Sequence, residues 1–388
     1  MEYERYYALE DSHIHVETNN EKLLGWFGSF LDHFVPYTIT APNPFVDLDA
    51  VVSLRRTEAQ DDNIVDLLGF EPHLASLPIH RFRWFDYSTD VRTIISAPTR
   101  TIYRIETTGD ILVIDRKESL VILESTFETR NSYMSAVMIV FCVLIERLRG
   151  REWLVMHAGG LDCEGKGIVV GGASGAGKST LLLSLLFNGA GRLVNNDRIL
   201  MKVIDGKVIM IPGRVSSLRV GLGFLAQHED LSSLYITPRD PHSHPPRFAP
   251  DTAWWKVTGV RRSTIPHKLD ITPTELVALS GEEFCRRTEV NLWIFPSFQP
   301  NFPVPVVRAM HQKELGGRIA ALLETEIERP VVDFFDRERN PSTRTYEQRL
   351  ITESAMAAKG CEVVFGPCLG DYLPAVWKNI DLLLREMV

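Results

Sequence analysis

A chain of 388 residues is long enough for two domains, and its hydrophobic content of 45% and charged content of 24% are ordinary for a soluble globular protein. The formal net charge of −8 argues against a nucleic-acid-binding surface as the main function, so we expect no nucleic-acid partner.

The cysteines and the first residues bear on localisation. The chain has five cysteines, an odd number, and no C-x-x-C pair, which predicts reduced thiols in a cytoplasmic protein. Residues 1–5 are charged and lack the apolar core of a signal peptide. We therefore expect a cytoplasmic protein without a membrane partner.

The first part of the chain predicts an α+β module, which we place at residues 1–125. Residues 23–34 have the apolar spacing of a helix. Strand-like runs follow at 47–54, 92–96, 101–105, 111–115 and 120–124. Short polar breaks separate the last three runs and suit antiparallel hairpins.

A second domain is predicted for residues 126–388. It opens with the most apolar stretch of the chain, residues 134–145, inside a helix predicted for 132–148. A stretch of about a dozen residues is too short to span a bilayer, which needs roughly 20. The stretch therefore predicts a buried helix.

The second domain contains the phosphate-binding pattern G-x-x-x-x-G-K-[ST] without a mismatch. Its residues are Gly172, Ala173, Ser174, Gly175, Ala176, Gly177, Lys178 and Ser179, followed by Thr180. Residues 167–170 before it predict a short buried strand, and residues 180–186 predict a helix. A strand that leads into a glycine loop and then a helix turns backbone N–H groups toward an anion. The pattern predicts binding of ATP or a close relative; a glycine-rich turn without a ligand is the alternative.

Individual residues near this loop have expected roles of their own. Lys178 would reach the outer phosphates, and the Ser179 hydroxyl would hold Mg²⁺. Asp197, 19 positions after Lys178, is expected at the end of the next strand, where it would share the metal. Motor-type and ABC-type ATPases place this acid far downstream after an apolar strand, but the run at 290–295 ends in Pro296 without an acid. The layout is therefore that of a small kinase.

The order of motifs around the loop resembles the HPr kinase/phosphorylase family, whose catalytic domain is related in fold to phosphoenolpyruvate carboxykinase. The shared order is a histidine (His157), a glycine hairpin, a strand, the loop, its helix, R-L-V and an acidic position. The resemblance covers about residues 150–225 and includes 218–223, which is similar to the family's R-G-L-G element with one residue inserted. It implies an α/β fold with a P-loop kinase core, with His157 near the transferred phosphate and Arg219 near the phosphates. The module at 1–125 does not resemble the family's regulatory domain, so the likeness is to the wider group of HPr-kinase-related proteins.

One departure from that family bears on the reaction. The family has two aspartates where this chain has Asn196 and Asp197. The resemblance implies that the first aspartate accepts a proton in the forward reaction and donates one in the reverse reaction. An amide cannot take up a proton at neutral pH, so Asn196 predicts a kinase without phosphorylase activity. For His157 and Arg219, the alternatives are a core histidine bonded to the backbone and an exposed structural arginine.

Features farther along the chain are compatible with function or with ordinary structure. The proline-rich stretch 238–250 fits a lid loop or a surface excursion, and its His242 and His244 lack a third ligand at metal spacing. A basic cluster could bind phosphates or form a solvated face, and two adjacent tryptophans could stack on a ring or pack in a core. These residues are Trp254, Trp255, Lys256, Arg261, Arg262, His267 and Lys268.

We therefore expect a kinase that transfers the γ-phosphoryl group of ATP, with Mg²⁺, to a serine-type hydroxyl of a peptide, protein or small molecule. Two alternatives stay open. One is a nucleotide-binding regulator or scaffold with weak ATPase activity, which Asn196 favours. The other is a metabolite kinase of the shikimate or nucleotide-kinase type, although such kinases usually begin almost at the loop. The sequence names no acceptor and is compatible with a homo-oligomer.

Overall fold

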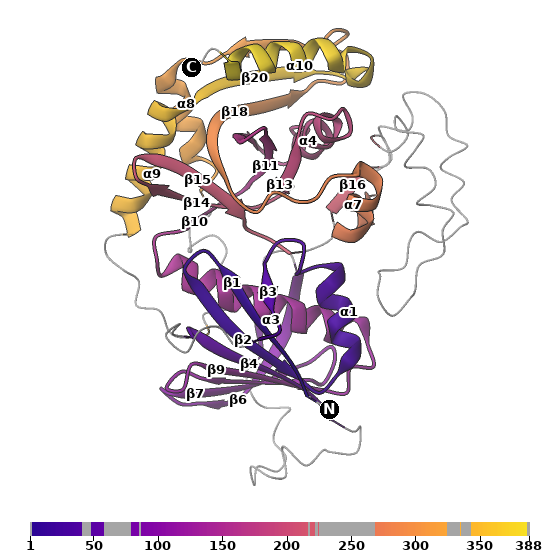
Figure 1. The fold of residues 1–388 in the computed structure, drawn as a ribbon, viewed down its shortest axis with the longest axis vertical. Coiled ribbons are helices and arrows are strands. Elements are labelled where there is room, and N and C mark those ends of the chain that lie inside the picture. The colour runs from indigo at the N-terminus through magenta and orange to yellow at the C-terminus, as the bar shows by residue number, and fades with distance from the viewer. Residues whose placement is uncertain are drawn as a thin grey trace, which may run out of the picture. The chain divides into compact units, whose positions relative to one another are not determined.

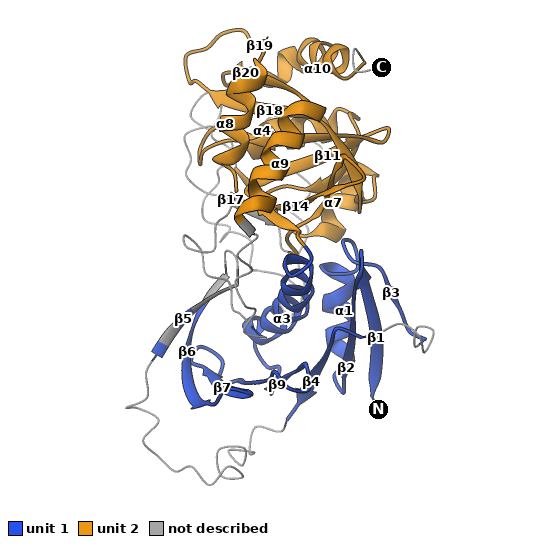
Figure 2. Ribbon diagram, turned by 90° about the vertical axis from the view of Figure 1, so that its left-hand side faces the viewer, with its two compact units in different colours: residues 1–151, 325–339 blue, residues 152–324, 340–388 orange. Residues whose placement is uncertain are grey.

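The computed structural model describes residues 2–40, 48–57, 79–84, 87–215, 218–221, 224, 268–323, 334 and 343–385. They form two compact units (Figure 1, Figure 2). Unit 1 comprises residues 1–151 and 325–339, and unit 2 comprises residues 152–324 and 340–388. Each unit combines a mixed sheet with helices, which confirms the α/β class.

Unit 1 is a mixed sheet with helices packed on it. Its elements are β1 (Tyr3–Leu9), β2 (Ser12–Thr18), α1 (Glu21–Ser29), β3 (Tyr37–Thr38), β4 (Ala50–Arg56), β5 (Ile79–Trp84), β6 (Tyr87–Ser96), β7 (Arg100–Ile105), β8 (Ile111–Asp115), β9 (Leu120–Ser125) and α3 (Arg130–Arg149). The strand order is β3-β1-β2-β4-β9-β8-β7-β6-β5. Strand β4 runs parallel to both its neighbours, and β7, β8 and β9 form the antiparallel hairpins that the sequence predicts.

Helix α3 forms the core of unit 1. Every residue from Ser132 to Glu146 is buried, and the helix packs against β2, β4 and α1. Its length and composition would allow it to cross a membrane, but 89% of its apolar window is buried inside the protein. The buried helix expected from the sequence is therefore present. The sequence-based domain boundary at 125/126 precedes this helix, whereas α3 belongs to unit 1 because its packing partners are elements of that unit.

Helix α1 is shorter than the apolar spacing predicts. The sequence pattern covers residues 23–34, but the helix ends at Ser29 because Phe30 leaves helical backbone angles. Phe30 and Phe34 are nevertheless buried, in turns that follow the helix. The apolar spacing therefore continues beyond the helix. At the other end, the Asn20 side chain caps the helix by accepting a hydrogen bond from the backbone N–H of Lys22.

Unit 2 is a second mixed sheet, with a separate short ribbon. Its strands are β10 (Leu154–Met156), β11 (Ala158–Cys163), β12 (Lys166–Gly171), β13 (Arg192–Asn195), β14 (Ile199–Ile204), β15 (Lys207–Pro212), β16 (Leu218–Gly221), β17 (Lys268–Ile271), β18 (Thr288–Phe298), β19 (Val306–Ala309) and β20 (Lys359–Phe365). Its helices are α4 (Lys178–Phe187), α7 (Pro273–Ser280), α8 (Gln312–Ala320), α9 (Thr343–Ala357) and α10 (Leu369–Arg385). The main order is β10-β14-β15-β18-β12-β11-β13; β20 pairs with β18 and β19, and β16 pairs with β17.

The central strands of unit 2 are buried on both faces. In β12, Ile168, Val169 and Val170 are completely inaccessible to solvent, as are Leu292 and Trp293 in β18. Continuous apolar runs of this kind are typical of parallel strands covered on both sides, and β12 and β18 do run parallel. The loop that follows β12 is therefore attached to a strand whose apolar residues are fully buried.

Candidate functional site

The loop between β12 and α4 has a backbone conformation that depends on its glycines. Gly175 has a φ of +81° and Gly177 a φ of +93°, angles that residues with a side chain rarely adopt. A Cβ atom on Gly177 would lie 2.6 Å from a ring carbon of Phe365, whereas one on Gly175 would have no neighbour within 4 Å. The glycines of the sequence motif are therefore required by conformation and, at Gly177, also by space.

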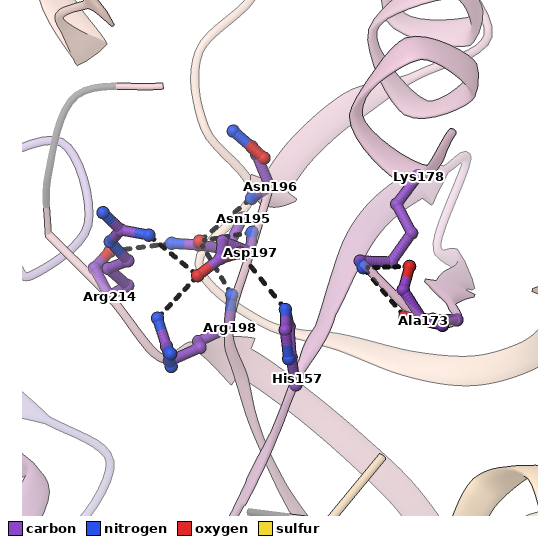
Figure 3. A network of polar contacts seen from close by, with 9 residues as sticks. His157, Ala173, Lys178, Asn195, Asn196, Asp197, Arg198 and Arg214 are labelled. Atoms are coloured by element: carbon purple, nitrogen blue, oxygen red, sulfur yellow. Dashed lines mark hydrogen bonds and ion pairs between the residues drawn. The ribbon is translucent and has the colours of Figure 1, made fainter. Parts of the chain in front are cut away.

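The loop leads into the N-terminus of helix α4, and the side chain of the first helical residue, Lys178, lies against the loop. Helix α4 begins at Lys178, and Gly177 before it has no side chain with which to cap the first N–H groups. Because the first turn carries no acidic residue either, the positive end of the helix dipole is not offset from within the helix. The Lys178 ammonium donates to the carbonyl oxygens of Gly172 (2.8 Å) and Ala173 (3.1 Å), so it lies against the loop (Figure 3).

Two neighbouring strands support the loop. The backbone N–H of Phe298, at the end of β18, donates to the carbonyl oxygen of Ala176 at 3.1 Å. The Phe298 ring packs edge to face on Phe365, at the end of β20, with a centroid distance of 5.8 Å. Because β12, β18 and β20 are parallel, their carboxyl ends meet here. This is the edge at which parallel α/β sheets place ligand sites.

The same sheet edge receives His157 and the turn after β13. Strand β11 is antiparallel to β12, with Ala158 opposite Gly171, so His157 lies next to the start of the loop. Asn195, the last residue of β13, pairs with β11 on its other side. The register therefore brings His157, the loop and Asp197 to one edge of the sheet.

Asp197 is the centre of a polar network (Figure 3). Its Oδ2 accepts hydrogen bonds from Nη1 of Arg198 at 2.6 Å and from Nη1 of Arg214 at 2.7 Å. Its Oδ1 lies 3.5 Å from Nε2 of His157. The side chain of Arg198 is 1% exposed and that of Arg214 is 11% exposed, compared with 27% for Asp197. Two largely buried guanidinium groups thus hold one carboxylate oxygen, and the other faces the histidine.

These contacts fix the charge of Asp197. Burial alone would raise the pKa of this carboxyl group, but the hydrogen bond from His157 and the charges of Arg214 and Arg198 outweigh it and hold the pKa well below its usual range. Asp197 is therefore ionised at neutral pH and is a weak proton acceptor.

Asn195 shapes the turn that carries Asp197. Its Oδ1 accepts from the backbone N–H groups of Asn196 at 2.9 Å and Asp197 at 3.3 Å. Its Nδ2 donates to the carbonyl oxygen of Arg214 at 2.7 Å. The Asn195 side chain therefore ties this turn to the segment after β15 that supplies Arg214.

Sequence reasoning did not identify three members of the network, Asn195, Arg198 and Arg214. An asparagine at the end of a predicted strand is a signal for a side-chain-capped turn, and this signal could have identified Asn195. No local pattern shows that Arg198 is buried. Arg214 stands 17 residues after Asp197 and returns to it only because β14 and β15 form a hairpin.

Asn196 lies in the same turn but outside the contacts of Asp197. In Figure 3 its side chain points away from the Asp197 carboxylate. Its Oδ1 is buried and has no hydrogen-bond partner among the described residues. The position thus offers a hydrogen-bond acceptor that cannot act as a base.

For several residues selected from the sequence, the structure describes the backbone alone or does not include the residue. Arg219 lies in β16, where its backbone pairs with Asp270 of β17, and its predicted role near the phosphates stays a prediction. Lys268 is likewise described only as a strand residue of β17. The proline-rich stretch 238–250, the two tryptophans and the rest of the basic cluster lie outside the described residues.

The two expected magnesium ligands, Ser179 and Asp197, differ in how well their surroundings suit a metal. Among the residues that the structure describes, no group of three or more histidine, cysteine, aspartate or glutamate side chains could hold a metal. Ser179 lies half-buried in the first turn of α4, where a hydroxyl ligand is expected. Both oxygens of Asp197 are already in contact with other side chains. Its expected role as a direct metal ligand stays a prediction and is the least well matched to these contacts.

Comparison with known proteins gives little support beyond this geometry. No protein-family profile and no curated protein matches the sequence. Among solved structures, the chain is similar to the HPr(Ser) kinase/phosphatase from Coxiella burnetii, with 14% sequence identity over 59% of this chain and 96% of that chain. The TM-score is 0.27, a similarity too weak to carry any argument about the fold or the function.

Proposed function

We propose that unit 2 binds ATP at residues 172–179 and transfers its γ-phosphoryl group to a hydroxyl group of a peptide, protein or small molecule. The observation that carries this proposal is the loop itself, at the carboxyl edge of β12 with Lys178 folded against it and the start of α4 behind it. Loop N–H groups, helix dipole and ammonium are together complementary to a triphosphate. His157 and Asp197 at the same edge favour group transfer over binding alone.

Phosphoryl transfer passes through a loose transition state, so its catalysis requires mainly alignment of the reacting groups and neutralisation of the phosphate charge. The loop amides would hold the phosphates, and Lys178 would neutralise the outer ones. Ser179 is the side chain that would contact magnesium. Magnesium, when bound, would supply charge neutralisation on the phosphates.

Asn196 bears on the direction of the reaction. Regenerating ATP or forming pyrophosphate from a phosphorylated product requires a proton donor for the leaving hydroxyl oxygen; the amide at position 196 cannot be that donor, so any donor has to come from another residue. We expect forward kinase activity with little phosphorylase activity. Asn196→Asp should raise the ratio of reverse to forward rate, measured as labelled pyrophosphate formed from labelled phosphate. An unchanged ratio would show that this position does not control the reverse step.

The direct test is a transfer assay with γ-labelled ATP and a panel of serine peptides, proteins and small alcohols. The wild type should label an acceptor, and Lys178→Ala should abolish labelling. Lys166→Ala is the matched control because Lys166 lies at the opposite end of β12, where its ammonium contacts the carbonyl oxygen of Leu384. Equal labelling by wild type and Lys178→Ala would contradict the proposal.

A second candidate function is a nucleotide-binding regulator with weak ATPase activity, and the amide at position 196 favours it. The same assay separates the two functions, since a regulator would release labelled phosphate without labelling any acceptor of the panel. A metabolite kinase of the shikimate or nucleotide-kinase type would label only small alcohols. We also propose a cytoplasmic location without nucleic-acid or membrane partners, and leave a homo-oligomer to be tested by light scattering.

A further inference from the structure

The Asp197 carboxylate has a different set of partners from those of a typical magnesium ligand. Its Oδ2 is shared by Arg198 and Arg214, and its Oδ1 faces Nε2 of His157. A magnesium ion bound directly to this carboxylate would have to displace a guanidinium group or lie within a few ångströms of two of them. Like charges at that separation repel strongly in a partly buried site.

We propose that Asp197 positions His157 as the proton acceptor for the hydroxyl group that receives the phosphate, and that Asp197 is not a direct ligand of magnesium. This inference rests on the proposed phosphotransferase function and deepens it. It gives the arginines a role as well: they fix the carboxylate so that a single oxygen is directed at the histidine.

Asp197 and His157 match the acid–histidine part of a nucleophile-activating triad, in which an acid orients a histidine and the histidine takes the proton of a hydroxyl group. The backbone N–H of His157 donates to the carbonyl oxygen of Leu322 at 2.8 Å, which fixes the main chain at the start of β11. With Nε2 toward Asp197, the Nε2–H tautomer is favoured and Nδ1 is the basic nitrogen. The His157 side chain is 28% exposed, so it is partly open to solvent.

The proposed step conserves atoms and electrons. The oxygen of the acceptor hydroxyl forms a bond to the γ-phosphorus while the bond from that phosphorus to the β–γ bridging oxygen breaks. ADP leaves with the electron pair of the broken bond. The hydroxyl proton passes to Nδ1 of His157, which becomes an imidazolium stabilised by the Asp197 carboxylate, and the proton is later released to water.

Among the described residues, the neighbouring side chains leave few other candidates for the proton acceptor at this edge. Asn196 has a buried amide oxygen without a partner among the described residues, and an amide cannot take up a proton. Asp197 accepts hydrogen bonds from two guanidinium groups and is a weak proton acceptor, and Lys178 is a donor bound to loop carbonyls. Of the sequence-selected residues at this edge, His157 remains as a base.

A first test reads the histidine tautomer without any turnover. Nitrogen NMR of the ¹⁵N-histidine-labelled full chain, assigned by loss of one signal in His157→Gln, should show His157 protonated at Nε2 in its neutral form. Asp197→Asn should shift it toward a mixture of tautomers. The control is Asp162→Asn, which removes the carboxylate of another Arg-paired aspartate (Arg192 to Asp162, 2.8 Å) at the far end of β11. An Nδ1–H form in the wild type, or no change in Asp197→Asn, would overturn the positioning role.

A second test uses ATP turnover with water as the acceptor. His157→Gln should lower kcat about 10²- to 10⁴-fold, the usual contribution of a general base, with the Kd for ATP unchanged. Asp197→Asn should lower kcat too, but should have no further effect when added to His157→Gln, because it acts through the histidine. Multiplicative losses in the double variant would show that the two residues act independently.

The magnesium dependence of turnover tests the claim that Asp197 is not a direct ligand of magnesium. The magnesium concentration for half-maximal turnover should be the same in Asp197→Asn, Asp162→Asn and wild type. A rise of about tenfold or more in Asp197→Asn alone would identify Asp197 as a metal ligand. If the wild type neither binds ATP nor releases phosphate, the proposed function fails. If it turns over ATP but His157→Gln is as active as wild type, only the present inference fails.

Discussion

Gly177→Ala tests whether the loop depends on the left-handed backbone and the close ring contact at this position. A residue with a side chain at the φ of +93° costs about 1–2 kcal/mol in backbone strain. The new Cβ would lie 2.6 Å from Cζ and 3.3 Å from Cε1 of Phe365, a ring that is completely buried and cannot easily move. Overpacking of this kind costs about 1–3 kcal/mol more. The variant should therefore lose about 2–5 kcal/mol of unfolding free energy.

Gly175→Ala is the matched control for this experiment. Its φ of +81° carries a similar strain, but its Cβ would meet nothing within 4 Å, so it should lose only about 1–2 kcal/mol. The assay is urea unfolding followed by tryptophan fluorescence, since the buried Trp293 reports on unit 2. Phe365→Leu combined with Gly177→Ala should lose less stability than the sum of the single variants. A Gly177→Ala variant no less stable than Gly175→Ala would refute the steric argument.

Three further changes have expected outcomes. Arg198→Met should cost about 1.5–3 kcal/mol of unfolding free energy, because it removes a buried hydrogen bond to a charged group. Arg192 is half-exposed, so Arg192→Met should cost less, and equal losses in urea unfolding would contradict this. Because the pKa of Asp197 is lowered in the folded state, its contribution to stability is present above the unfolded value of about 3.9 and is lost as the pH falls toward the native pKa. The stability difference between wild type and Asp197→Asn should shrink between pH 5 and pH 3 in unfolding experiments, and a constant difference would show that the shift is absent. Burial raises the pKa of Asp110, whose contribution is therefore lost as the pH rises through the native value, so Asp110→Asn should be more favourable relative to wild type at pH 7 than at pH 4 in the same assay.

The parts of the fold that the sequence predicted are those with local signals. The loop at 172–179 was predictable because its glycines, lysine and flanking strand and helix are contiguous in the chain. Helix α3 was predictable because an apolar run of this length at helical spacing has few alternatives. The hairpins of β7, β8 and β9 were marked by polar breaks between alternating strands.

The parts that could not be predicted depend on tertiary register. Arg214 reaches Asp197 because β14 pairs with β15 with Ile199 opposite Pro212, and the backbone N–H of Gly213 then bonds to the carbonyl oxygen of Arg198. Nothing in the residues around position 214 encodes that pairing. The meeting of β18 and β20 behind the loop depends in the same way on strands more than 100 residues later in the chain.

The assignment of Asp197 shows how such register changes a functional interpretation. Its spacing from Lys178 predicted a metal ligand, and spacing alone cannot show which cations already surround a carboxylate. The arginines on its Oδ2 favour a positioning role instead. A pattern can thus select a residue, while the tertiary neighbours of that residue bear on what it can do.

Calorimetric titration of ATP with magnesium into the full chain tests the central claim most directly. The wild type and Lys166→Ala should each bind one nucleotide in a saturable manner, and Lys178→Ala should bind it much more weakly while keeping its melting temperature without nucleotide. A bound nucleotide should also raise the melting temperature of the wild type by mass action. Absence of binding by the wild type, or equal affinity in Lys178→Ala, would contradict the account.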